Sequence, residues 1–198
     1  MLISVEEGVL DEYLVVATPQ EYDGSPGVNT FRMDYAPRSV HPDRLALAAY
    51  LLFRPWASGP LQLPSPVSPA LAEAIAALHA VCSVQPGPVD LTPRTGPPGR
   101  RPLRLAWRTD HSSEPPPGGM TVNLLRSDEA SGALRTAQSV WLPSNAFMLA
   151  ETEARELDVA LAIGCLLAGD LDVRELHLPV AVPEPLSRLL HRAGLSLA

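Results

Sequence analysis

Two long apolar segments limit the folds that this chain can adopt. They are Leu45–Phe53 and Val159–Gly169, and neither contains a charged residue. Each is about half of the ~20 residues that a helix needs to cross a bilayer, so the sequence predicts helices inside a globular protein. The first segment is apolar nearly all round when it is drawn as a helix. We therefore expect it to be buried on most faces.

Strands and helices alternate along the chain, with turn residues between them. The predicted strands are Leu2–Val5, Tyr13–Ala17, Thr30–Tyr35, Leu61–Leu63, Leu103–Arg108, Thr121–Leu125, Ser139–Leu142 and Glu175–Leu178. The predicted helices are His41–Phe53, Ala70–Val81, Glu153–Ala168 and Glu184–Ala193. This alternation favours parallel pairing with right-handed crossovers, and we expect additional antiparallel pairing among the N-terminal and central strands.

A shift of 115 residues makes the two halves of the chain read alike. Ala46–Phe53 then falls on Leu161–Ala168, and Leu61–Pro64 falls on Leu176–Pro179. Gene duplication would leave this pattern, although segments rich in Leu, Ala and Pro also resemble one another by chance. The sequence therefore predicts an α/β fold, a mixed sheet built from two related strand–helix–strand–helix halves packed as one globular unit.

A stretch rich in proline, glycine and arginine separates the two halves. We expect an N-terminal α/β half at residues 1–91, a linker at 92–102 and a C-terminal α/β half at 103–198. Five arginines lie close together in and after this linker: Arg94, Arg100, Arg101, Arg104 and Arg108. They fit either an anion-binding surface or a solvated linker and edge strand that charge protects from aggregation.

The composition excludes several kinds of chemistry. All 15 basic residues are arginine, so a P-loop or a Schiff-base mechanism would need a lysine from another chain. The net charge of −7 makes a nucleic-acid or anionic-membrane surface unlikely to form. Abundant Ala, Leu, Pro and Arg without lysine are typical of a GC-rich bacterial genome.

The cysteines and the N-terminal residues indicate the cellular compartment. Cys82 and Cys165 lie in apolar helical patterns, far apart in the sequence, and do not form a disulfide framework. The first residues are acidic where a signal peptide is positively charged. We expect a cytoplasmic protein.

Polar residues follow several predicted strands, where α/β sheets commonly bind ligands. The candidate ligand-binding residues are Asp34, Tyr35, Arg38, His41, Asn123, Arg126, Asp128, Ser144 and Asn145. Together they offer carboxylates, amides and an arginine clamp for an anion. Each also has an ordinary structural role open to it, such as capping a helix or pairing with a neighbouring charge.

Metal and cofactor motifs are weak. His79 and Cys82 lie three residues apart on one predicted helix face, without a second pair to complete a zinc site. The segment Gly96–Gly99 contains two prolines, which remove the amide donors that a phosphate cradle uses. We expect no metal and no cofactor.

Two classes of function remain. The first is a small-molecule-binding protein, either a simple binder or a metal-free enzyme of a specialised pathway, that uses the residues at the strand ends. The second is a non-catalytic assembly subunit that uses its apolar helices and Arg-rich linker to bind itself or a protein partner. The sequence favours the first, and it leaves both catalysis and oligomeric state open.

Overall fold

The structure is a computed structural model, and it describes residues 1–9, 11–79, 83–92, 96–97, 99–107 and 114–198. Its strands are β1 (Leu2–Glu7), β2 (Tyr13–Thr18), β3 (Thr30–Met33), β4 (Gly59–Val67), β5 (Val84–Val89), β6 (Arg101–Trp107), β7 (Met120–Arg126), β8 (Leu134–Arg135), β9 (Ser139–Ser144), β10 (Val173–His177) and β11 (Ser196–Leu197). Its helices are α1 (Pro42–Phe53), α2 (Pro69–Ala77), α3 (Ala146–Leu149), α4 (Glu153–Leu167) and α5 (Glu184–Arg192), with a 3₁₀ turn at Arg54–Trp56.

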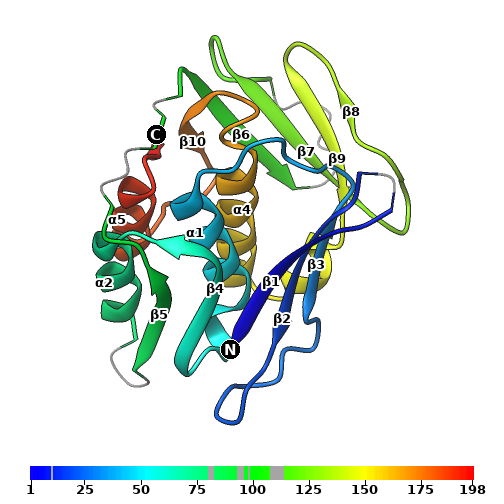
Figure 1. Ribbon diagram of the computed structural model, residues 1–198. Coiled ribbons are helices and arrows are strands. Elements are labelled where there is room, and N and C mark those ends of the chain that lie inside the picture. Colours follow the sequence, from blue (N-terminus) through cyan, green and yellow to red (C-terminus); the bar gives the residue numbers. More distant parts are fainter. Residues whose placement is uncertain (10, 80–82, 93–95, 98, 108–113) are drawn as a thin grey trace.

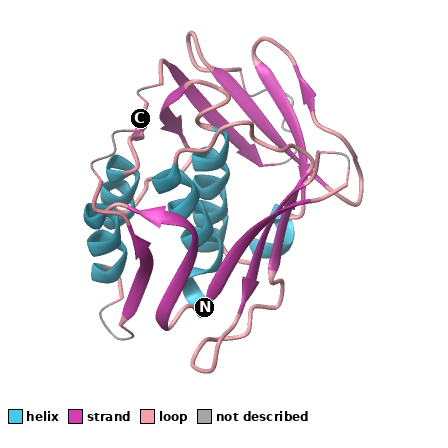
Figure 2. Cartoon of the chain, in the orientation of Figure 1, coloured by secondary structure: helices cyan, strands magenta, loops and turns pink. Residues whose placement is uncertain are grey.

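All eleven strands belong to one mixed sheet, which makes this an α/β fold (Figure 2). The strand order is β11-β10-β6-β7-β9-β3-β2-β1-β4-β5, and β8 pairs with β9. The sheet curves around α1 and α4, while α2 and α5 lie side by side near its two ends (Figure 1). The antiparallel pair β3–β9 joins the N-terminal strands to the C-terminal ones.

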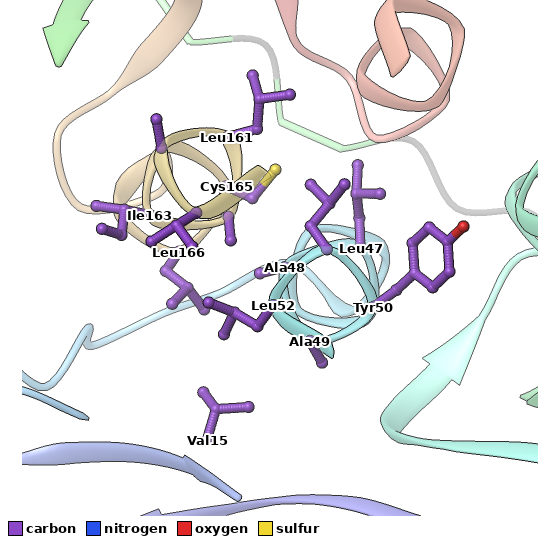
Figure 3. Packing of buried hydrophobic residues seen from close by; sticks show 14 of the residues in the cluster. Val15, Leu47, Ala48, Ala49, Tyr50, Leu52, Leu161, Ile163, Cys165 and Leu166 are labelled. Atoms are coloured by element: carbon purple, nitrogen blue, oxygen red, sulfur yellow. The ribbon is translucent and has the colours of Figure 1, made fainter. Parts of the chain in front are cut away.

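Helices α1 and α4 form the centre of the core. Every residue of Ala46–Phe53 is at most 1% exposed, and Val159–Ala162 are at most 2% exposed. Figure 3 shows Leu52 and Leu166 between the two helices, with Val15 of β2 facing them. On the other side, α4 lies so close to β10 that a Cβ on Gly164 would be 2.9 Å from a methyl carbon of Leu176. The apolar segments are therefore covered from several sides.

Local capping explains where both central helices begin. The His41 ring accepts a hydrogen bond from the Asp43 N–H at the start of α1, and Pro42 occupies the first helical position. Thr152 caps α4 in the same way through the N–H of Arg155. Both signals lie within a few residues of the helix start, so the sequence could predict them.

Arginine side chains fix the two ends of α1, and of these Arg44 is buried and Arg155 is partly buried. Near its start, the Arg44 guanidinium donates to the carbonyl oxygens of Ala193 and Gly194, each at 3.1 Å, and so ties α1 to the end of α5. At its end, Arg155 of α4 donates to the carbonyl oxygens of Leu51 and Leu52. Leu51 and Leu52 lie in the last turn of α1, where carbonyl groups lack partners within the helix. The Arg155 guanidinium therefore supplies the hydrogen bonds that these two carbonyls need.

The Arg155 charge is balanced by Asp158, which is 1% exposed. Asp158 accepts hydrogen bonds from Arg155 at 3.0 Å and from Arg54 at 2.8 Å. Burial raises the pKa of this carboxyl group, while the two arginines act in the opposite direction. The cluster links α4 to the end of α1 by polar contacts inside an otherwise apolar interface.

The sequence predictions held for most elements, with four differences. No strand was predicted at the edge strand β5 (Val84–Val89), which contains two prolines. The short elements β8, α3 and β11 were missed. The expected antiparallel pairing occurs among β1, β2 and β3 and also at β3–β9 and β8–β9, whereas β6, β7 and β9 pair in parallel with one another. Helix α2 ends at Ala77, earlier than predicted.

The two halves contain matching series of elements. The strand orders β3-β2-β1-β4-β5 and β9-β7-β6-β10-β11 match in position, and each half has a helix–strand–helix unit at its end. The strand directions differ, because β1, β2 and β3 pair antiparallel and β6, β7 and β9 pair in parallel. Leu63 lies inside β4, whereas Leu178 lies one residue beyond β10. Gene duplication remains a prediction, as does the division into halves at 1–91 and 103–198.

Within the described residues, no helix has both the length and the apolar character needed to cross a membrane.

The core packing predicts a large cost for truncating either central helix. Leu51 and Leu161 are 1% and 0% exposed, so Leu51→Ala or Leu161→Ala should lower the free energy of unfolding by about 2–5 kcal/mol, through lost transfer energy and the cavity left behind. Urea denaturation measures this loss. Leu91→Ala, at a position that is 81% exposed, is the control, and an equally small effect of all three changes would contradict the core assignment.

The buried thiol of Cys165 gives a second prediction. Burial raises its pKa from 9.0 to about 12. Because the folded-state pKa exceeds the unfolded one, the associated stability is fully present below the ordinary thiol pKa and is lost as the pH rises toward the folded-state value. In a Cys82→Ser background, iodoacetamide at about pH 8 should label Cys165 only after denaturation, because the thiolate is the reactive form. Labelling of the folded protein at the unfolded rate would contradict this burial.

Candidate functional site

A cavity of about 630 Å³ lies beside the loop that follows β3. It is lined by Asp11, Asp34, Tyr35, Ala36, Arg38, Gly132, Ala133, Arg135 and Asp170. We call it the Arg38 cavity. It brings together three of the predicted site residues, Asp34, Tyr35 and Arg38, with residues from β8 and from the turn between α4 and β10.

Asp170 holds the loop in place. Its carboxylate accepts hydrogen bonds from the Tyr35 hydroxyl at 2.9 Å and from the backbone N–H groups of Arg38 at 2.9 Å and Ser39 at 3.3 Å. Burial raises the pKa of Tyr35, and Asp170 adds to this, while Arg135 opposes it. The phenol therefore stays protonated at neutral pH and serves as a donor.

Asp34 is also engaged by the backbone. One carboxylate oxygen accepts the Gly132 N–H at 2.9 Å, and the Asp34 N–H donates to the Pro143 carbonyl at 3.0 Å. The other oxygen, Oδ1, is buried and has no hydrogen-bond partner among the described residues. Gly132 has a φ of +76°, a conformation that glycine adopts at little cost. Asp34 thus fixes the β7–β8 connection against the loop after β3.

The two arginines of the cavity make different contacts. Both Arg38 and Arg135 are exposed, and Arg135 is close enough to Tyr35 to oppose the rise in its pKa that burial causes. The Arg38 guanidinium makes no hydrogen bond or ion pair with the described part of the chain. Two positive groups therefore border a cavity in which the carboxylates of Asp34 and Asp170 already accept hydrogen bonds from the protein.

The other predicted site residues lie elsewhere. His41 caps α1. Arg126 and Asp128 form an exposed ion pair, with Nη2 and Oδ2 2.8 Å apart. Asn123 lies on β7, with its backbone opposite Trp141 of β9. None of these residues is among those that line the Arg38 cavity.

Asn145 and Ser144 continue the junction between β9 and β3. The Asn145 side chain accepts the Arg32 N–H and donates to the Thr30 carbonyl oxygen, both at 2.7 Å. Its own N–H donates to the Arg32 carbonyl. Ser144 is buried and pairs with Met33. The polar atoms of the Asn145 amide thus extend the hydrogen bonding between the two strands.

The sequence analysis did not identify four residues that line the cavity: Asp11, Gly132, Arg135 and Asp170. They are far from the β3 loop in sequence, and only the tertiary fold brings them to it. Asp170 carried a weak local signal, because it follows the glycine that ends α4. Nothing in the local pattern marks Arg135.

The described residues contain no group of three or more His, Cys, Asp or Glu side chains that could hold a metal ion. His79, considered with Cys82 as half of a zinc site, shares a hydrogen bond of 2.9 Å with the Tyr50 hydroxyl. Cys82 lies outside the described residues, as do Arg94 and Arg108 of the arginine cluster. Of the other arginines, Arg100 pairs with Asp172 at 3.0 Å.

Comparison with protein-family models, curated proteins and solved structures found no match.

The geometry at Asn145 predicts a structural effect of its removal. Asn145→Ala leaves the Arg32 N–H and the Thr30 carbonyl without their partner, and should lower the free energy of unfolding by about 1–3 kcal/mol. Urea denaturation measures it, with Asn123→Ala as the matched control on a neighbouring strand. Equal stability of the two variants would contradict the bridging role of Asn145.

Proposed function

We propose that this protein binds a small molecule carrying an anionic group in the Arg38 cavity. The observation that carries the proposal is the pair of guanidinium groups, Arg38 and Arg135, at one cavity in which the carboxylates of Asp34 and Asp170 each accept a backbone N–H. Arginine binds carboxylate and phosphate groups through paired, charge-assisted hydrogen bonds. The protonated Tyr35 hydroxyl adds a further polar group beside them.

The size and charge of the cavity limit the range of ligands that it can bind. Its volume of about 630 Å³ falls in the range of small-molecule sites. Asp11 also borders it, so a ligand with an amino or N–H group beside its anionic group fits better than a simple dianion. We place this activity in the cytosol of a bacterium, because the composition and the cysteine usage favour that setting.

One argument for the alternative function, an assembly subunit, does not hold. It relied on apolar helices as docking surfaces, but the apolar stretches of α1 and α4 are buried inside the sheet. Arg100, one of the arginines of the linker, pairs within the chain. No observation in the described structure favours assembly over ligand binding.

Removing either arginine tests the proposal. Wild type and the variants Arg38→Ala and Arg135→Ala are titrated by calorimetry with inorganic phosphate, citrate and L-glutamate. At least one of these should bind, and each variant should weaken it about 10- to 150-fold, the equivalent of a charge-assisted hydrogen bond of about 1.5–3 kcal/mol.

Arg192→Ala, an exposed arginine on α5, is the control and should bind as the wild type does. Two results would contradict the proposal. In one, both cavity variants bind as tightly as the control. In the other, no panel member binds and native mass spectrometry of protein purified from its host shows no small molecule bound.

A further inference from the structure

A second cavity lies at the point where the strand order of the C-terminal half reverses. β6 is followed by β7 and then β9 on one side, whereas β10 pairs with β6 on its other side and β11 continues outward from it. β6, β7, β9 and β10 are parallel, so their carboxyl ends share one edge of the sheet. Ligands of α/β proteins commonly bind outside the carboxyl ends of strands at such a switch point.

A cavity of about 520 Å³ occupies this place. Its residues include Trp107 at the end of β6, His177 at the end of β10 and Glu156 in the first turn of α4. We call it the Trp107 cavity. In Figure 1, β6 and β10 lie next to each other above α4, in agreement with their pairing. It shares no lining residue with the Arg38 cavity.

Trp107 supplies an aromatic surface in a fixed orientation. Its ring meets Phe147 of α3 edge to face, with the centroids 5.3 Å apart and the planes at 83°. Trp107 is only half-buried, so part of the ring stays accessible at the cavity. A planar ring that stacks on the indole would gain contact area without reordering it.

The remaining lining places the polar side chains of Arg104, Glu156 and His177 among apolar residues, and the Arg104 guanidinium donates to the Glu114 carbonyl oxygen at 2.8 Å. Leu105 and Leu178 are the apolar neighbours. Glu156 is exposed in the first turn of α4 and offers a carboxylate acceptor, while the His177 imidazole can donate or accept. An apolar cavity with few polar groups is typical of a small-molecule site, and here these groups flank an aromatic ring.

We propose that the Trp107 cavity binds a planar nitrogen heterocycle of nucleobase size. The ring stacks on Trp107, a ring N–H donates to the Glu156 carboxylate, and a ring nitrogen or carbonyl faces His177. The carboxylate selects a ring with N–H donors over a plain aromatic hydrocarbon, because such a hydrocarbon would leave it without a hydrogen bond. This proposal is independent of the anion proposed for the Arg38 cavity.

The test uses guanosine, adenosine, cytidine and uridine as probes, with inositol as a non-planar control ring. Equilibrium dialysis measures their binding to wild type, Trp107→Leu and Glu156→Gln. At least one nucleoside should bind with a Kd below about 1 mM and inositol should not. Each variant should weaken binding about tenfold or more, within the range measured for base–aromatic stacking.

The protein has three tryptophans, which give a second readout. The indole N–H signals should be resolved by NMR, and the signal of Trp107 should shift on binding while that of Trp141 on β9 stays in place. Trp141→Phe and Arg192→Ala should bind the nucleoside as the wild type does. Because Glu156 is exposed, Glu156→Gln tests the site even if Trp107→Leu does not fold.

Three results would overturn the proposal: no nucleoside binds, inositol binds equally well, or Glu156→Gln binds as tightly as the wild type.

Discussion

Helices α1 and α4 are apolar around most of their circumference, and the rest of the structure is arranged to cover them. Burying one face of such a helix leaves the others in water, so a flat sheet beneath the pair would not suffice. The curved sheet encloses the pair from several sides, and α2 and α5 lie near its ends. Gly164 permits the close approach of α4 to β10 that this enclosure requires.

Enclosure creates a second demand, because the ends of a buried helix carry backbone groups that need partners. At the end of α1, Arg155 donates a hydrogen bond to the Leu51 carbonyl oxygen, and the carboxylate of Asp158 balances the charge of Arg155. Arg44 links the start of α1 to the end of α5 in a similar way. The long, multidentate guanidinium group suits a task that needs several carbonyl partners at once, which fits a chain that uses arginine for all its basic residues.

Because the core is filled in this way, neither the Arg38 cavity nor the Trp107 cavity lies between the central helices, and both lie beside strand ends. β3 is antiparallel to β9, and its last residue, Met33, pairs with Ser144, the last residue of β9. Asp170 of the Arg38 cavity precedes β10, whereas His177 of the Trp107 cavity is the last residue of β10. The Arg38 cavity follows β3 and the Trp107 cavity follows β6 and β10. The two cavities thus lie toward opposite ends of β10, and one has arginines and carboxylates while the other has an aromatic ring, which suits them to chemically different ligands.

Local patterns made the helices and their starts predictable, since His41, Pro42 and Thr152 act within one turn. The predicted burial of the first apolar segment on most faces is confirmed for Ala46–Phe53. Strand β5 was missed because its prolines resemble a linker, although an edge strand tolerates them. The β3 loop was a reasonable guess for a site, but Arg135 and Asp170 reach it only through the fold. Asn145 was selected because it follows a predicted strand. In the structure its side-chain amide forms hydrogen bonds with the backbone of β3, a strand far away in the sequence.

The central functional claim is that Arg38 and Arg135 jointly hold an anionic group. NMR of the arginine side-chain N–H groups, recorded while phosphate, citrate or L-glutamate is added, tests it most directly. The account predicts that the signals of these two arginines shift together and saturate at one ligand per chain, while those of buried Arg44 stay in place. Signals that move equally for all exposed arginines, without saturation, would contradict it.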